Sequence, residues 1–132
     1  MVILDTNVII DHLRQPPDTE SLLIKLKKKI DRDRLAISMI TIQELYVGKS
    51  TKRKEDEKNL LAVVGALKIL EYSYEVAKLA GELERDLNLT IEFSDAAIAA
   101  TAIVNGAELV TLNRKHFEKI AGLELFHLKA ST

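Results

Sequence analysis

The sequence predicts an α/β fold in which a mostly parallel sheet carries helices on both faces. The chain opens with an apolar run from Met1 to Leu4 that stops on the carboxylate of Asp5. A buried parallel strand delivers a polar group to the edge of a sheet in this way. Short apolar runs then alternate with longer segments whose apolar residues recur at helical spacing. A chain of 132 residues is expected to form one domain, residues 1–132.

The elements of the first half each have a local cause. The first helix is ended by Pro16 and Pro17, because proline disfavours helix in the residue before it. The second helix carries Leu22, Leu26 and Ile30 four residues apart on one face. The expected helices are 8–14, one beginning at Thr19, 41–47 and 55–67, and the expected strands are 1–4, 35–38 and a short one at 69–70.

In the second half, five alanines between Ala96 and Ala102 predict a helix whose backbone comes close to the sheet. Gly106 ends this helix. The segment before it, from Tyr74 to Leu87, is amphipathic, with charged residues between its apolar ones. The expected helices are 74–87, 94–104 and 114–120, and the expected strands are 108–112 and a possible fifth at 123–128.

Composition limits the kinds of protein this chain can be. Apolar residues make up 47% and charged residues 30%, which is typical of a globular protein. No apolar stretch approaches the ~20 residues of a membrane span, so no membrane partner is expected. The absence of cysteine removes thiol catalysis and cysteine-ligated zinc, and it favours a reducing cytoplasm.

Three acidic residues, Asp5, Glu44 and Asp95, lie after predicted strands or at helix starts that face them. Each also has a purely structural interpretation. Thr41 and Glu44 have the spacing of a capping box at the start of a helix. Ser94 can cap a helix whose positive end Asp95 complements, and Asp5 can cap the helix that follows it.

Taken together, the three acids indicate a metal site, because these places share one crevice in a doubly wound sheet. Asn113 follows the fourth strand and arrives there as well. Two like charges about 4 Å apart repel by ~4 kcal/mol at an effective dielectric of 20, which a divalent cation relieves. Oxygen ligands without histidine or cysteine favour Mg²⁺ or Mn²⁺ over zinc. The pattern predicts metal-assisted phosphodiester cleavage.

The segments that carry these features are Leu4-Asp5-Thr6-Asn7, Glu44-Leu45, the stretch from Ser94 to Ala102, and the stretch from Leu109 to Phe117. This ordered set resembles the PIN-domain nucleases and, more narrowly, the VapC-type toxins of bacterial and archaeal toxin–antitoxin pairs. The resemblance runs from Asp5 to about Leu125, nearly the whole chain.

The resemblance implies a three-layer, Rossmann-like α/β/α sandwich around a sheet of four or five strands. It implies an endoribonuclease that depends on Mg²⁺ or Mn²⁺, with Asp5, Glu44 and Asp95 as metal-binding acids. Asn113 falls where the family has a further Asp or Asn, so its carbonyl can ligate or bond a water but adds no charge. A homodimer and a small antitoxin, whose C-terminal segment lies over the active site, are also implied.

Several residues are expected to support this site. Thr6 and Asn7 match family positions that orient the first acid, and Thr111 places a hydroxyl beside the cleft. Glu92, three residues before Asp95, is expected to be an exposed loop acid. The candidates for contact with RNA phosphates are Arg14, Lys49, Arg114 and Lys115.

Histidine and aromatic chemistry are not expected to carry the reaction. No two of the three histidines have ligand spacing, and His116, in a basic helix, is expected to face solvent or phosphate. Six aromatic residues are too few for a base-stacking platform.

Two other functions fit parts of the pattern. A haloacid-dehalogenase-like phosphatase also begins with a strand that runs into an aspartate, but it needs a second aspartate where this chain has Asn7. A non-catalytic α/β domain that binds a protein partner would use the acids only as helix caps. The choice of RNA and the number of metal ions are left open by the sequence.

Overall fold

The computed structural model describes residues 1–48, 51–88 and 90–128. Its centre is a sheet of four parallel strands in the order β3-β2-β1-β4. The strands are β1 (Val2–Leu4), β2 (Leu35–Ser38), β3 (Lys68–Leu70) and β4 (Glu108–Val110). Because all four run in the same direction, their carboxyl ends meet at one edge. β1 lies inside the sheet, and each of its residues is buried.

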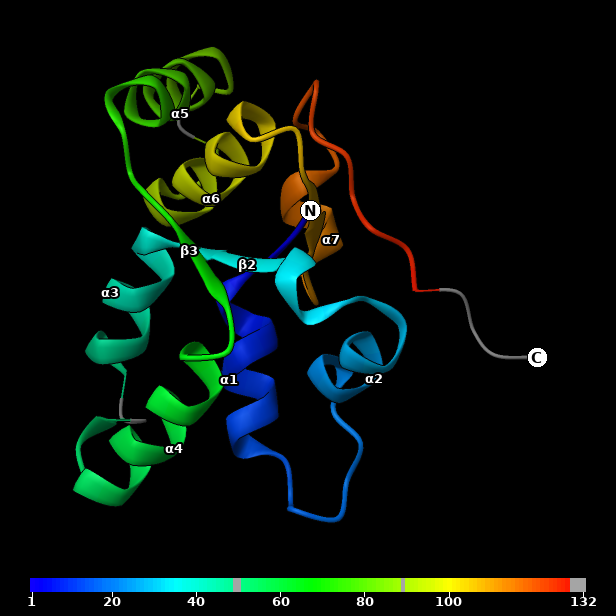
Figure 1. Ribbon diagram of the computed structural model, residues 1–132. Coiled ribbons are helices and arrows are strands. Elements are labelled where there is room, and N and C mark those ends of the chain that lie inside the picture. The colour runs from blue at the N-terminus through cyan, green and yellow to red at the C-terminus, as the bar shows by residue number, and fades with distance from the viewer. Residues whose placement is uncertain (49–50, 89, 129–132) are drawn as a thin grey trace.

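Helices cover both faces of this sheet, as Figure 1 shows. The helices are α1 (Thr6–Arg14), α2 (Leu22–Lys29), α3 (Met39–Val47), α4 (Lys54–Val64), α5 (Tyr74–Asp86), α6 (Phe93–Val104) and α7 (Arg114–Phe117), with a 3₁₀ turn η1 (Arg32–Arg34) before β2. One core lies between the sheet and α5, α6 and α7, and a second lies between the sheet and α1, α2 and α4. The expected α/β/α arrangement of three layers is confirmed.

Alanine decides how closely α6 approaches the sheet. Ala99, Ala100 and Ala102 are fully buried in one core with Ile3 of β1 and Leu109 of β4. Side chains this small let the helix backbone lie against the strands without a large residue between them. The same helix carries Asp95 in its first turn, so the packing of its alanines against the sheet also sets how close the Asp95 carboxylate lies to the sheet.

Five helix starts differ from those expected. α1 begins at Thr6 and not at Val8, and α4 begins at Lys54 and not at Glu55. Ser21 caps α2, so this helix begins at Leu22 and not at Thr19. The Ser38 hydroxyl caps α3, so the helix already runs through Thr41, which is therefore not its cap. α6 begins at Phe93, one residue before Ser94, which is therefore not its cap either.

The sheet has four strands in the described part of the chain, so the possible fifth strand at 123–128 does not form. Leu109 donates its N–H to the carbonyl of Glu124 and accepts from the N–H of Phe126, which makes one isolated bridge. Its strand neighbours Glu108 and Val110 point their backbone groups toward β1 instead. The fourth strand and several helices are also shorter than expected, with α4 ending at Val64 and α7 at Phe117.

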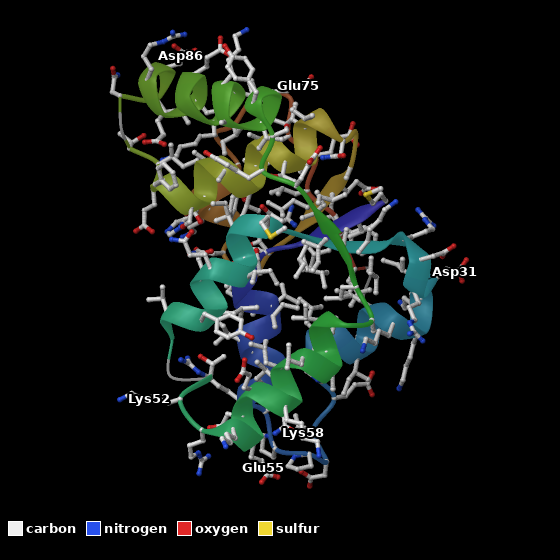
Figure 2. The ribbon with its side chains drawn as sticks, turned by 60° about the vertical axis from the view of Figure 1, so that its left-hand side comes forward. Asp31, Lys52, Glu55, Lys58, Glu75 and Asp86 are labelled. Carbon is white, nitrogen blue, oxygen red and sulfur yellow. The ribbon has the colours of Figure 1, made fainter. Side chains whose placement is uncertain are left out.

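Charged side chains lie on the outside of the layers. Figure 2 shows Asp31, Lys52, Glu55, Glu75 and Asp86 at the periphery of the molecule, and all five are exposed. None of the helices in the described ranges is long and apolar enough to cross a membrane.

The close contact between α6 and the sheet leads to a stability prediction. Ala100→Leu adds three carbon atoms to a fully buried position, and we expect it to lower the free energy of unfolding by about 1–3 kcal/mol. Urea denaturation measures the change. Lys78→Leu, on the exposed side of α5, is the control and should change stability by less than about 0.5 kcal/mol. An equal effect of both substitutions would show that α6 does not pack closely.

Candidate active site

Asp5 is held at the carboxyl edge of the sheet by backbone and side-chain contacts. Its N–H donates to the carbonyl of Val110 at 2.8 Å, which extends the pairing of β1 and β4 by one residue. Its Oδ1 accepts from the Thr6 N–H at 2.8 Å, as an N-cap of α1. Its Oδ2 accepts from the Thr111 hydroxyl at 2.7 Å. The residue is only 4% exposed, yet both carboxylate oxygens have donors.

Thr111 joins the end of β4 to the start of α1. Its hydroxyl donates to Asp5 and accepts from the backbone N–H of Asn113 at 2.9 Å. Asn7 supports the same turn: its Oδ1 accepts from the Leu112 N–H at 3.3 Å, and its Nδ2 lies 3.5 Å from the Thr111 hydroxyl. A hydroxyl has one hydrogen to donate, so these acceptor contacts orient it toward Asp5.

Glu44 is linked to Asp5 through Thr6. The Thr6 hydroxyl donates to Glu44 Oε1 at 2.7 Å, so its contact with the Thr41 hydroxyl at 2.9 Å must be one in which Thr41 donates. Thr41 and Glu44 therefore lie on the face of α3 that meets α1. The capping-box interpretation of this pair is wrong, because Ser38 caps the helix and Glu44 bonds another element.

Asp95 approaches from α6 and contacts His116 of α7. Its Oδ2 lies 3.3 Å from His116 Nδ1, and the Asp95 side chain is 16% exposed. The Asn113 side-chain Nδ2 lies 3.0 Å from the same ring nitrogen. When His116 donates its Nδ1–H to Asp95, its Nε2, 3.2 Å from Asn113 Nδ2, is the ring nitrogen that can accept from the Asn113 amide. From the sequence, His116 is expected to face solvent or phosphate; its side chain is 51% exposed, and its ring also contacts the Asp95 carboxylate.

The three carboxylates act on one another electrostatically. Burial raises the pKa of Asp5 to about 6; the hydrogen bonds from Thr111 and Thr6 oppose the rise, and the charges of Asp95 and Glu44 add to it. Burial also raises the pKa of Asp95, against the lowering effect of His116, and Glu92 and Glu44 raise it further. The fold therefore gathers Asp5, Glu44 and Asp95 into one electrostatic site.

The basic residues expected to contact RNA are more dispersed over the molecule than the three acids. Arg14 is exposed at the far end of α1, about 13 Å along the helix from Asp5. Arg114 binds the C-terminal segment, through a backbone carbonyl at 3.2 Å and His127 Nε2 at 3.0 Å. Lys115 is exposed on α7, and Lys49 lies outside the described residues.

The acids fit a divalent cation by their chemistry, although they do not form a closed cage. In the described part of the chain, no group of three or more histidine, cysteine or acidic side chains is arranged to hold a metal ion. Mg²⁺ characteristically keeps several waters and uses one or two carboxylates together with substrate phosphates. Carboxylates that share one edge and raise one another's pKa suit that kind of open site.

Sequence reasoning missed two residues of this site, Thr41 and His116. Thr41 lies three residues before Glu44, so the two share one face of α3. This spacing indicates a shared site only when Ser38, and not Thr41, is known to cap the helix. His116 follows Asn113 by three residues, but only the packing of α7 against α6 brings its ring to Asp95.

The raised pKa of Asp5 predicts a pH dependence of stability in the presence of a chelator. Below pH 4, the carboxyl is protonated in both folded and unfolded chains. Between pH 4 and 6 it ionises first in the unfolded chain, so stability falls as pH rises, by about 3 kcal/mol from this group. Asp5→Asn cannot ionise, so its stability relative to the wild type should increase across this window. Urea denaturation of both proteins at several pH values measures the difference, and a constant difference would contradict the raised pKa.

The family model of the PIN domain matches residues 2–123 of this chain. Ribonuclease VapC2 of Rickettsia felis is 34% identical over 127 residues, which cover 92% of this chain and 93% of that protein. The tRNA(fMet)-specific endonuclease VapC of Salmonella typhimurium is 30% identical over 128 residues, with 92% and 93% covered.

Solved structures show the same similarity. The VapBC2 complex of Rickettsia felis bound to a promoter DNA fragment contains a chain with a TM-score of 0.78 and 31% identity, covering 98% of this chain and all of that one. The DNA-bound VapBC complex of Salmonella typhimurium gives a TM-score of 0.82 at 27% identity, with 95% and 96% covered. The chain therefore belongs to the PIN-domain family, among its VapC-type toxin ribonucleases.

Proposed function

We propose that this protein is the toxin of a toxin–antitoxin pair and cleaves RNA phosphodiester bonds internally at the site formed by Asp5, Glu44 and Asp95, with Mg²⁺ or Mn²⁺. The observation that carries the proposal is the convergence of three carboxylates at the carboxyl edge of a parallel sheet, where open α/β folds bind ligands. The VapC ribonucleases to which the chain is similar support it. We also propose that it acts in the cytoplasm.

Asp5, Glu44 and Asp95 would hold the cation, with Asn113 close enough to His116 to contribute an amide contact at the rim. A divalent cation held there would lower the pKa of a nearby water and would neutralise charge that develops on the phosphate. Thr6 and Thr111 hold Glu44 and Asp5 in place by donating hydrogen bonds to them. Asn7 fixes the turn that carries Thr111.

Water, and not Asp5, is the nucleophile in this proposal. Both Asp5 oxygens accept hydrogen bonds from the protein, which lowers the reactivity of the carboxylate. A haloacid-dehalogenase-like phosphatase would need a second acid at position 7, and Asn7 is instead bonded to the β4 turn. The phosphatase alternative therefore has no supporting contact at this site.

RNA would approach over α7, where Lys115 is exposed beside His116 in the chain and Arg114 lines a pocket with Thr111. Arg14 is proposed to contact a more distant phosphate of a longer substrate. Lys49, which lies outside the described residues, is also proposed to contact an RNA phosphate. An antitoxin is the proposed protein partner, because the similar solved chains are from VapBC complexes. A homodimer is also proposed, and the large exposed apolar residues Val47, Leu61, Tyr74 and Phe93 are available for such contacts.

The first test is RNA cleavage. With Mn²⁺ and a single-stranded RNA mixture, we expect cleavage that a chelator abolishes. Asp5→Asn, Glu44→Gln and Asp95→Asn should each lower the rate by about 10²-fold or more, because each removes charge from the group that stabilises the transition state. Gel analysis of end-labelled RNA measures the rates.

Asp86→Asn is the matched control, since Asp86 is an exposed aspartate on α5 that pairs with Arg85 away from the site. Its activity should equal that of the wild type. Cleavage that survives the chelator, or full activity of Asp5→Asn, would contradict the proposed site.

Metal binding has a separate readout in thermal stability. Mn²⁺ at about 100 times its dissociation constant should stabilise the wild type by about 2.7 kcal/mol. Asp95→Asn should remove this gain. Without metal it should be as stable as the wild type or more so, because it relieves repulsion among the acids while its amide oxygen can still accept from His116. A loss of stability that is the same with and without Mn²⁺ would indicate that Asp95 serves only the helix end.

A further inference from the structure

A pocket of about 120 Å³ lies beside the catalytic carboxylates, between the start of α6 and α7. It is lined by Thr90, Ile91, Glu92, Asp95, His116 and Lys119. At ~30 Å³ for each water, its volume corresponds to about four water molecules, which is enough for the edge of a nucleobase but not for a whole nucleotide. Asp95 belongs both to this pocket and to the proposed metal site. A group bound in the pocket would therefore lie next to the phosphate that is cleaved.

The pocket presents an acceptor that the fold does not use. The Glu92 carboxylate makes no hydrogen bond or ion pair within the described residues, and it does not cap α6 although it occupies the N-cap position. Its charge also raises the pKa of Asp95. The acid is exposed, as expected from the sequence, but it faces the same pocket as the catalytic aspartate.

Lys119 supplies a donor fixed on the same pocket. Its Nζ donates to the Thr90 carbonyl at 3.0 Å and to the Thr90 hydroxyl at 3.3 Å. An ammonium group has three hydrogens, so one remains for a ligand. Ile91 is buried and adds an apolar wall to the pocket.

The charges of the pocket favour a base over a second phosphate. Two acids, one lysine and one histidine line it, so it has no excess positive charge to attract an anion. A neutral ligand with donors for Glu92 and an acceptor for Lys119 is complementary. The Watson–Crick edge of guanine has two adjacent donors, N1–H and N2–H, that match a carboxylate, and the O6 acceptor beside them.

We propose that this pocket is a guanine subsite, in which Glu92 accepts from N1–H and N2–H, Lys119 donates to O6, and the guanine flanks the cleaved bond. The proposal rests on the RNA cleavage proposed above. In this proposal Glu92 and Lys119 determine which base is preferred next to the cut. The three carboxylates and their cation catalyse the cleavage.

The experiment uses the full chain and a single-stranded RNA library with randomised bases, cleaved with Mn²⁺ and sequenced at the cut ends. The wild type should prefer guanine at one position next to the cut by roughly tenfold. Glu92→Gln and Lys119→Met should each reduce this preference to less than about twofold, while total cleavage persists. Glu118→Gln, which removes an equal charge next to Lys119 without lining the pocket, should keep the preference.

Inosine in place of the preferred guanosine removes only the N2 donor. It should lower kcat/KM of the wild type several-fold and that of Glu92→Gln little. No guanine preference in the wild type, or a preference unchanged in both variants, overturns the subsite but leaves the nuclease function intact.

If the wild type cleaves no RNA, the nuclease proposal fails separately. Fluorescence anisotropy of guanosine- and inosine-containing oligomers then tests the pocket directly, and equal affinity for the two overturns it. Melting curves of each variant confirm that it is folded.

Discussion

A carboxylate buried at the end of the central strand is the constraint around which this protein is arranged. Asp5 must lie at the sheet edge, because its backbone continues the pairing of β1 with β4, yet an ion is costly in so dry a place. The Thr6 N–H and the Thr111 hydroxyl offset part of that cost. These hydrogen bonds keep the acid in one orientation, and its pKa is raised to about 6. A cation bound beside it would favour the charged form of the carboxyl.

Threonine hydroxyls transmit this arrangement to the other elements. Thr6 connects Asp5 to Glu44 of α3, and Thr41 donates to Thr6 from the next turn of the same helix. Thr111 connects Asp5 to the turn that leads into α7. The hydroxyls of Thr6 and Thr111 each donate and accept, so the acids are held by directional contacts between separate elements. Among the described residues, every buried side-chain polar atom has a hydrogen-bond partner.

The remaining acid depends on packing. Asp95 stands where it does because the alanines of α6 let that helix lie close to the sheet, and because α7 places His116 against its carboxylate. Thr101 of α6 also donates to the Ala97 carbonyl and lies 3.3 Å from the Ser38 hydroxyl, which ties the helix to the end of β2. The pocket that Glu92 and Lys119 share with Asp95 exists only because these two helices meet.

The sequence by itself determined the alternation of strands and helices, the parallel sheet, and the three acids that follow strands or face them. These features depend on local spacing, which folding does not alter: apolar period, proline and alanine content, and the order of motifs. It did not determine the helix starts, since both Ser38 and Thr41 could cap α3. It also did not determine whether residues 123–128 form a fifth strand, because that depends on pairing with β4, where only the isolated bridge between Leu109 and Leu125 forms. Tertiary structure alone decided that Thr41 bonds Thr6, that His116 meets Asp95, and that Glu92 faces a pocket, because each contact joins residues from different elements.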